Sequence, residues 1–290
     1  EGPGEESGMT SFLYCDTCLG GIDKEIGRQE VPKANEMIRV RNLVAAYGDE
    51  IILDRVSFDV YEKEIFVVLG GSGCGKSTLL KHLVGLVRPN AGRIVIDGDD
   101  ISSGDEGSLE KALRKIGVLY QSGALLGSMS LGRNVALPIE EYTGLPPEHV
   151  DTLVRMKLKM VGLDGYEDYL PSELSGGMKK RGGLARAMAL NPKILFFDEP
   201  SAGLDPIISA EIDNLILHLN RTLGTTMVIV THELESVFAV ADRVIMLDRG
   251  KKGIIAEGAP RYLRDQSQND LVRRFFNPRA GSPPAREQQG

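Results

Sequence analysis

The chain has 290 residues, of which 42% are hydrophobic and 26% charged, and its formal net charge is −7. These values are typical of a large folded domain and exclude a chain that is disordered throughout. The acidic balance argues against a protein that binds nucleic acid by neutralising phosphates. Three cysteines are too few for a disulfide framework. With no signal peptide and no apolar run long enough to span a membrane, we expect the protein to stay in the cytosol.

Residues 1–36 are predicted to form an extension outside the core, because they mix Gly, Glu and Ser without sustained periodicity. Cys15 and Cys18 form a C-x-x-C pair in this extension. Such a pair can be half of a zinc site, but the chain has no second pair to complete it. We therefore do not favour a metal role for these cysteines.

From Met37 the pattern becomes that of an α/β domain. Alternating apolar residues at 38–44 and 56–60 predict half-exposed strands. The continuous apolar run 65–69 predicts a parallel strand buried on both faces. Similar short runs alternate with helical stretches, which is typical of an α/β sheet; they lie at 116–120, 194–197, 227–230 and 244–247.

Helical spacing predicts three further features. A helix is expected from near Ser77 to Val87, followed by the turn residues 88–92. Between 122 and 189 no convincing strand appears, so we expect a helical insertion there. The segment 261–290 is expected to be one helix followed by a tail in which Pro and Gly disfavour order.

The clearest chemical motif fits G-x-x-x-x-G-K-[ST] and lies between the buried strand 65–69 and a predicted helix. It consists of Gly70, Gly71, Ser72, Gly73, Cys74, Gly75, Lys76 and Ser77, and is followed by Thr78. The glycines let backbone N–H groups and a helix N-terminus bind phosphate oxygens. Lys76 would reach the β- and γ-phosphates and Ser77 would ligate Mg²⁺. A glycine-rich turn that binds nothing is the alternative, but the strand and helix on either side favour a nucleoside triphosphate site.

Asp198 and Glu199 directly follow the apolar run 194–197. The carboxyl end of a parallel strand is where α/β sheets bind ligands. Asp198 is therefore expected to hold Mg²⁺, and Glu199, pointing to the opposite side of the strand, to polarise a water in line with the γ-phosphate. Taken alone, two such carboxylates could instead cap a helix or remain solvated. The phosphate motif upstream favours the catalytic interpretation.

The segment 174–178 resembles the signature loop of ATP-binding-cassette (ABC) ATPases, although Met178 stands where Gln is usual. Further residues match the motifs of that family in order. They are Tyr47 for adenine stacking, Gln121 of the Q-loop, Asp205 at the end of the D-loop, and His232 as the switch histidine. Each alone has a simpler interpretation, as a packing residue, a strand-end polar group or a helix cap. Their serial order overturns those interpretations.

This resemblance implies a P-loop NTPase core of the α/β class, with an antiparallel β edge and an inserted helical subdomain at about 122–189, within an ATPase domain spanning 37–260. It also implies a head-to-tail dimer, in which ATP lies between 70–77 of one copy and Ser175, Gly176 and Gly177 of the other. Glu199, His232 and Lys76 are then catalytic. Ser77, Gln121 and Asp198 are then the metal ligands.

The segments 120–126 and 174–178 together are similar to the MlaF-type ATPases of bacterial Mla/Mce phospholipid transport systems. This similarity implies ATP hydrolysis that energises phospholipid transport, at the cytoplasmic face of the inner membrane. It also implies inner-membrane permease subunits, an Mce-domain protein and a small regulatory subunit as partners, and no nucleic acid. The permease would dock near Gln121 on Leu125, Leu126 and Met129; the alternative is that these residues pack the helical insertion's own core.

Three alternatives stay open from the sequence. The first is the ATPase of another ABC transporter, for an amino acid or another solute. The second is a soluble ABC ATPase acting on DNA or ribosomes, which the single cassette and the short spacing between its motifs disfavour. The third is an ATP-binding regulator without turnover, which the presence of Glu199 and His232 disfavours.

Overall fold

Residues 35–277 are described here in a computed structural model. The Cys15 and Cys18 pair and the tail from 278 onwards lie outside the described residues. The predictions for them are therefore not taken further.

A six-stranded sheet forms the centre of the fold, with the strand order β10-β9-β3-β8-β7-β6. β3 pairs in parallel with β8 and β9, and β7 pairs in parallel with β6 and β8, while β10 is antiparallel to β9. The strands are β3 (Ile65–Gly70), β6 (Ile116–Leu119), β7 (Ile194–Asp198), β8 (Thr226–Thr231), β9 (Arg243–Asp248) and β10 (Gly253–Gly258). The predicted parallel α/β sheet is confirmed.

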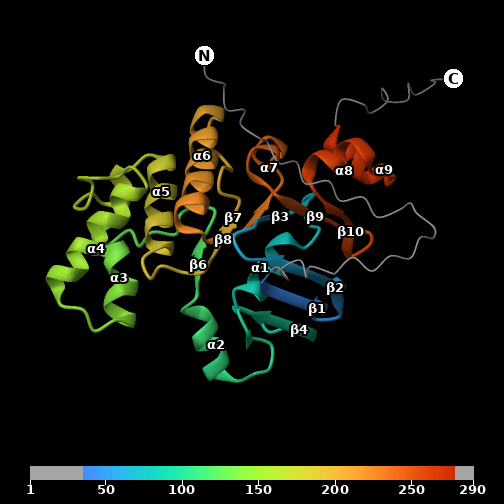
Figure 1. The fold of residues 1–290 in the computed structure, drawn as a ribbon, viewed down its shortest axis with the longest axis horizontal. Helices are drawn as coiled ribbons and strands as arrows, with labels where there is room; N and C mark the ends of the chain where they lie inside the picture. Colours follow the sequence, from blue (N-terminus) through green and yellow to red (C-terminus); the bar gives the residue numbers. More distant parts are fainter. Residues whose placement is uncertain (1–34, 278–290) are drawn as a thin grey trace, which may run out of the picture. The chain divides into compact units, whose positions relative to one another are not determined.

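Helices and a second sheet cover the two faces of this central sheet (Figure 1). Alternate residues of β3 point to opposite faces: Val67 and Leu69 pack with one buried cluster, and Phe66 and Val68 with the other. Outside the 122–189 segment the helices are α1 (Lys76–Leu83), α2 (Glu106–Leu113), α6 (Pro206–Leu223), α7 (Leu234–Val240), α8 (Pro260–Gln266) and α9 (Asp270–Phe276). The sheet is thus buried on both sides, as the continuous apolar run of β3 predicts.

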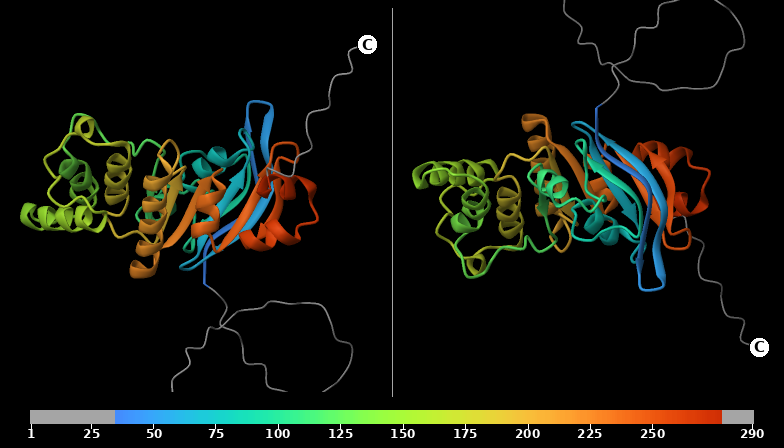
Figure 2. Two further views of the ribbon diagram at one scale, coloured as in Figure 1. Left: turned by 90° about the horizontal axis from the view of Figure 1, so that it is seen from above. Right: turned by 90° about the horizontal axis from the view of Figure 1, so that it is seen from below.

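The expected antiparallel edge is a sheet of its own. It comprises β2 (Glu50–Tyr61), β1 (Glu36–Tyr47), β4 (Ala91–Ile96) and β5 (Asp99–Asp100), in that order. Figure 2 shows the long strands β1 and β2 side by side, in blue. The Phe58 ring on β2 stacks on the Phe66 ring of β3, with 5.4 Å between ring centroids. This aromatic contact packs the second sheet against one face of the central sheet.

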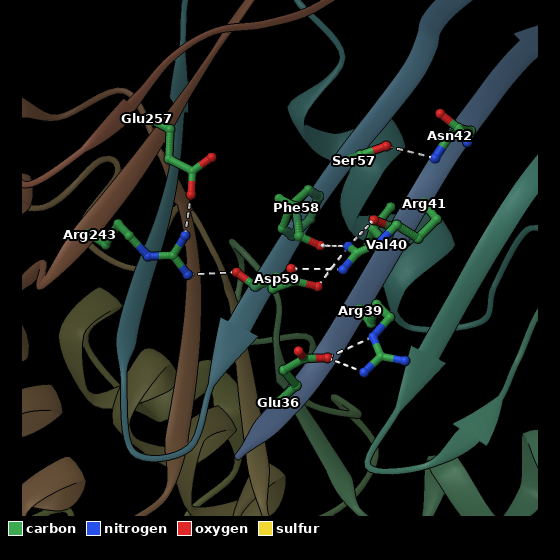
Figure 3. A network of polar contacts seen from close by, with 10 residues as sticks. All are labelled: Glu36, Arg39, Val40, Arg41, Asn42, Ser57, Phe58, Asp59, Arg243 and Glu257. Carbon is green, nitrogen blue, oxygen red and sulfur yellow. Dashed lines mark hydrogen bonds and ion pairs between the residues drawn. The ribbon is translucent and has the colours of Figure 1, made fainter. Parts of the chain in front are cut away.

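Arg243 on β9 joins the two sheets through polar contacts (Figure 3). Its guanidinium donates to the backbone carbonyl oxygen of Asp59 on β2 at 2.6 Å and pairs with Glu257 on β10. It also donates to Glu64 at 2.7 Å and lies over the Phe66 ring. Because the five donors of one guanidinium reach both sheets, this residue fixes their relative position.

The segment from 122 to 189 lies within the described residues and contains helices and no strand, as expected. Its elements are α3 (Leu131–Tyr142), α4 (Pro147–Met160), the 3₁₀ turn η1 (Pro171–Glu173) and α5 (Gly176–Ala187). Pro147 occupies the first position of α4, where its missing N–H costs nothing. Figures 1 and 2 show α3 and α4 beside α5 near the β6 end of the central sheet, with α8 and α9 near the β10 end.

Two helix boundaries differ from expectation. α1 ends at Leu83 rather than Val87, because Gly85 adopts a left-handed backbone with φ 73°. The segment after Pro260 is two short helices rather than one. The break between them is stabilised by Asn269, whose side-chain oxygen accepts a hydrogen bond from the Leu271 N–H and caps α9.

Gly117 on β6 lies where α5 ends, and this close approach leads to a stability prediction. A Cβ at this position would overlap the carbonyl oxygen of Ala187 and approach the Leu195 side chain to 2.9 Å. We expect Gly117→Ala to lower the free energy of unfolding by about 1–3 kcal/mol, through overpacking. Urea denaturation measures this change.

Gly127→Ala is the matched control, because nothing lies within 4 Å of a Cβ built there. Equal unfolding midpoints for the two variants would show that α5 is not held tightly against β6.

Candidate functional site

The loop between β3 and α1, residues 70–77, turns so tightly that only glycine fits at its last bend. Gly75 adopts φ 103°, and a Cβ there would lie 2.7 Å from the Leu53 side chain on β2. The side chain of Cys74, which belongs to this loop, is buried, and this burial raises the pKa of its thiol. The Cys74 side chain therefore packs as a neutral group in the core.

Lys76 and Ser77 begin α1 at this loop. The Lys76 side chain is buried and its Nζ donates to the carbonyl oxygens of Gly70 at 2.8 Å and Gly71 at 3.1 Å. Ser77 is exposed and Thr78 half-buried. Among the described residues, no side chain caps the N-terminus of α1. The first N–H groups of this helix can therefore bind an anion.

Asp198 ends β7 close to this loop. Burial raises the pKa of the Asp198 carboxyl, and the neighbouring Glu199 raises it further. The positive charges of Lys76 and Lys81 oppose both effects. Asp198 is therefore a half-buried carboxylate that a cation would stabilise.

Glu199 follows Asp198 with a left-handed backbone, φ 50°, which costs an L-residue about 1–3 kcal/mol. Its backbone N–H donates to the Val230 carbonyl oxygen at 2.9 Å. Its carboxylate accepts from Thr231 Oγ1 at 3.1 Å and lies 2.8 Å from Nδ1 of His232. The expectation that Glu199 points to the opposite side of β7 does not describe this geometry, because the left-handed turn directs Glu199 to the loop after β8.

The register of the sheet brings the loops after four strands to one edge. Leu69 on β3 pairs with Thr231 on β8, and Phe197 on β7 pairs with Ile229 on β8 and with Leu119 on β6. The residues at or just after these strand ends are Gly70, Gln121, Asp198, Glu199 and His232. Parallel pairing therefore gathers the predicted phosphate, carboxylate and histidine residues at the carboxyl edge.

Tyr47 lies at the end of β1 with half of its surface exposed. Ala45, two residues earlier, pairs with Leu53, the residue that touches Gly75. The β1–β2 hairpin thus contacts the 70–77 loop through Leu53 and also carries the exposed aromatic ring of Tyr47. Gln121 is exposed just after β6.

The signature segment, residues 174–178, starts α5. Ser175 caps α5 by accepting from the Met178 N–H at 3.2 Å, as its residue type suggests. Among the described residues no hydrogen bond joins Ser175, Gly176 or Gly177 to the 70–77 loop. Asp205 caps α6 by accepting from the N–H groups of Ile207 at 3.0 Å and Ile208 at 3.1 Å.

Two cations on α5 were not predicted from the sequence: Lys180, which is buried, and Arg186, which is half-buried. Lys180 Nζ donates to the carbonyl oxygens of Glu199 at 3.1 Å and Ala202 at 2.7 Å. Arg186 donates to the carbonyl oxygens of Ala124 at 2.8 Å and Gly123 at 3.3 Å, next to Gln121. Helical spacing could have indicated that Lys180 is buried, because it places Lys180 on the same helix face as Gly177 and Leu184. The structure shows that all three residues are buried.

Comparison with known proteins agrees with this arrangement. Residues 53–202, about half of the chain, match the family described as ABC transporter. The chain belongs to the ABC transporter family. It is 41% identical over 247 residues to the intermembrane phospholipid transport system ATP-binding protein MlaF of Haemophilus influenzae, covering 85% of this chain and 92% of the relative. It is 42% identical over 246 residues to the probable ribonucleotide transport ATP-binding protein mkl of Mycobacterium leprae, covering 85% of this chain and 70% of the relative.

The fold also resembles an ATP-binding cassette solved as a dimer in a post-hydrolysis state bound to ADP and Pi. The TM-score is 0.70 and the identity 32%, over 77% of this chain and 99% of that chain. As a member of this family, the protein is an ATP-binding ATPase.

The donor set fits Mg²⁺ that arrives with ATP. Within residues 35–277, no group of three or more His, Cys, Asp and Glu side chains is arranged to hold a metal ion. Ser77 and Asp198 supply a hydroxyl and a carboxylate oxygen, the hard ligands that Mg²⁺ takes together with phosphate oxygens and water. Magnesium bound there would neutralise phosphate charge.

Replacing Glu199 by Gln tests the role of this carboxylate. The amide keeps an oxygen that Thr231 can donate to, so we expect ATP affinity to remain. Without a carboxylate to polarise water, kcat for ATP hydrolysis should fall at least about 100-fold. Phosphate release and fluorescent-nucleotide binding measure the two quantities.

Glu235→Gln is the matched control, since Glu235 is an exposed carboxylate on the nearby α7. Undiminished hydrolysis by Glu199→Gln would contradict the role of Glu199.

Asp198→Asn should change stability and activity in opposite directions. The raised pKa of Asp198 means that the folded protein favours the neutral carboxyl. The contribution of the Asp198 carboxyl to stability is therefore fully present below its ordinary pKa of 3.8 and is lost as the pH rises through its pKa in the folded protein. At pH 7, without nucleotide or Mg²⁺, the substitution should therefore raise the free energy of unfolding. The gain should shrink as the pH approaches 4.

Urea titrations at several pH values test this, with the exposed Asp164→Asn as control. Hydrolysis should be lost in Asp198→Asn alone. A destabilised Asp198→Asn protein would contradict the assigned burial cost.

Proposed function

We propose that this chain is the ATP-hydrolysing subunit of a transporter that moves phospholipid between the inner and outer membranes. The observation that carries this proposal is the 41% identity to MlaF of Haemophilus influenzae over nearly the whole of that protein. The site geometry supports the hydrolytic part, and the relative's name supports the substrate.

In this proposal each residue at the sheet edge has one task. The backbone N–H groups of residues 70–77 hold the phosphates, and Lys76 leaves its contacts with Gly70 and Gly71 to donate to phosphate oxygens. Ser77 and Asp198 hold Mg²⁺, with Gln121 completing the set. Tyr47 stacks on the adenine ring.

Glu199 accepts a hydrogen bond from the attacking water and orients it. Its contact with His232 Nδ1 keeps the carboxylate directed towards the loop after β8 rather than into solvent. More than half of the His232 side chain remains exposed, and its ring can donate to the γ-phosphate. A charged acceptor and a donor thus flank the reacting phosphate.

A second copy of the chain is needed to complete the site. Ser175, Gly176 and Gly177 begin α5 without a bond to their own phosphate loop, and a helix N-terminus favours an anion. Solved cassettes with this fold are dimers. We propose that these residues cover ATP bound to the other copy, with Asp205 nearby at the interface.

Membrane partners are part of the proposal because the similar MlaF protein is named as the ATP-binding protein of an intermembrane phospholipid transport system. None of the described helices is long and apolar enough to cross a bilayer. Permease subunits in the inner membrane would anchor the chain at the cytoplasmic face. An Mce-domain protein and a small regulatory subunit would complete the assembly. Leu125 packs on the core, whereas Leu126 is exposed, so Leu126 is the better docking residue.

Reconstitution of the complex tests this function. The chain, co-purified with inner-membrane permease subunits and placed in vesicles, should move fluorescent phospholipid when ATP is added. Leu126→Asp should abolish co-purification while the isolated chain keeps its ATPase activity. Asn134 holds both the N–H and the carbonyl of Leu126, so the loop should keep its shape.

Leu145→Asp is the control, with 42% exposure against 41% for Leu126. ATP-driven movement of ribonucleotide, with phospholipid left in place, would replace this proposal with the activity named for mkl.

A further inference from the structure

Lys180 is a buried cation beside the hydrolytic residues. Its side chain is 5% exposed, and its two hydrogen-bond partners are the carbonyl oxygens of Glu199 and Ala202. Within residues 35–277 no carboxylate lies within ion-pair distance of its Nζ. Burying a lysine without an ion pair is unfavourable, and an apolar side chain could fill the same space. The amine is therefore not explained by packing.

The two carbonyls belong to the turn that follows β7. The Glu199 N–H is held by Val230, and its side chain by Thr231 and His232. Its carbonyl oxygen, the remaining polar group of this left-handed residue, accepts from Lys180 Nζ at 3.1 Å and from the Ala202 N–H at 3.3 Å. A left-handed glutamate persists only where its surroundings over-determine it. Outside β8 and the loop after it, Lys180 supplies the side-chain part of that constraint, because it bonds the carbonyl oxygens of both Glu199 and Ala202.

The other end of the link is the start of α5. Lys180 lies about one helical turn after Ser175. A Cβ on Gly177 would lie 2.7 Å from the Ile208 side chain, and one on Gly176 3.4 Å from Leu204. Glycines at these positions let α5 approach the turn and α6 closely. The helix that begins with the signature segment is therefore packed closely against α6 and hydrogen-bonded to the Glu199 turn.

We propose that Lys180 is a positioning residue that ties the signature helix to the backbone of Glu199. This inference rests on the proposed dimer, in which Ser175 covers the partner's ATP and Glu199 serves its own. Engagement of α5 at one ATP site then fixes the carboxylate at the other. Lys180 touches neither nucleotide in this scheme.

Steady-state hydrolysis of MgATP by the full chain tests this inference. Lys180→Met keeps the length of the side chain but loses the donors. We expect kcat to fall by about 10- to 100-fold, the effect of a small misplacement of a reacting group. KM and fluorescent-nucleotide affinity should stay within about twofold. Lys180→Arg keeps donors and should recover much of the loss.

Lys179→Met is the control, because it removes the same charge one position earlier on α5, from a side chain that is half-buried rather than buried. Wild-type kcat in Lys180→Met would overturn the inference. So would an equal loss in Lys180→Arg, or a kcat loss that tracks a lowered unfolding midpoint. If Lys180→Met does not fold, Lys180→Gln replaces it under the same criteria. Because phospholipid is absent from this assay, failure of the proposed transport function would not affect the result.

Discussion

Parallel pairing around β8 is the constraint on which the site depends. β8 lies between β3 and β7, and its register places Thr231 beside Leu69 and Val230 beside Asp198. This register therefore brings together three segments that lie far apart in the sequence: the phosphate loop, the two carboxylates and His232. Burial of β3, β7 and β8 on both faces fixes this register, since every residue of β8 is inaccessible to solvent. A slip by one residue would reverse each side chain.

Helix α5 adds a second constraint at the same edge. Arg186 binds the carbonyls of Gly123 and Ala124 beside Gln121, and Lys180 binds those of Glu199 and Ala202. A single helix thus contacts the loops after β6 and β7 through one half-buried and one buried cation. Because the signature segment begins this helix, contacts at its N-terminus reach both loops. In the proposed dimer, this arrangement places a short chain of contacts between the signature segment and the hydrolytic turn.

The motifs could be predicted because phosphate and Mg²⁺ chemistry require particular residues at fixed spacing, as for Gly75 and Lys76. The parallel strands were equally visible as short apolar runs. The separate second sheet was not, since it depends on the contact of Phe58 with Phe66, which alternation alone does not encode. The left-handed backbone of Glu199 was also hidden, because no pattern marks a non-glycine residue that tertiary hydrogen bonds hold at positive φ. For Lys180, helical spacing can indicate burial, but it does not show that the amine bonds to the Glu199 turn.

A structure of Glu199→Gln with MgATP would test the central claim most directly. The account predicts the triphosphate on the backbone of residues 70–77 and magnesium between Ser77 and Asp198. It also predicts Lys76 Nζ on phosphate oxygens instead of its carbonyl partners, with Ser175 of a second copy over the γ-phosphate. Nucleotide bound elsewhere, or bound at this loop with Lys76 still on Gly70 and the signature segment facing solvent, would contradict it.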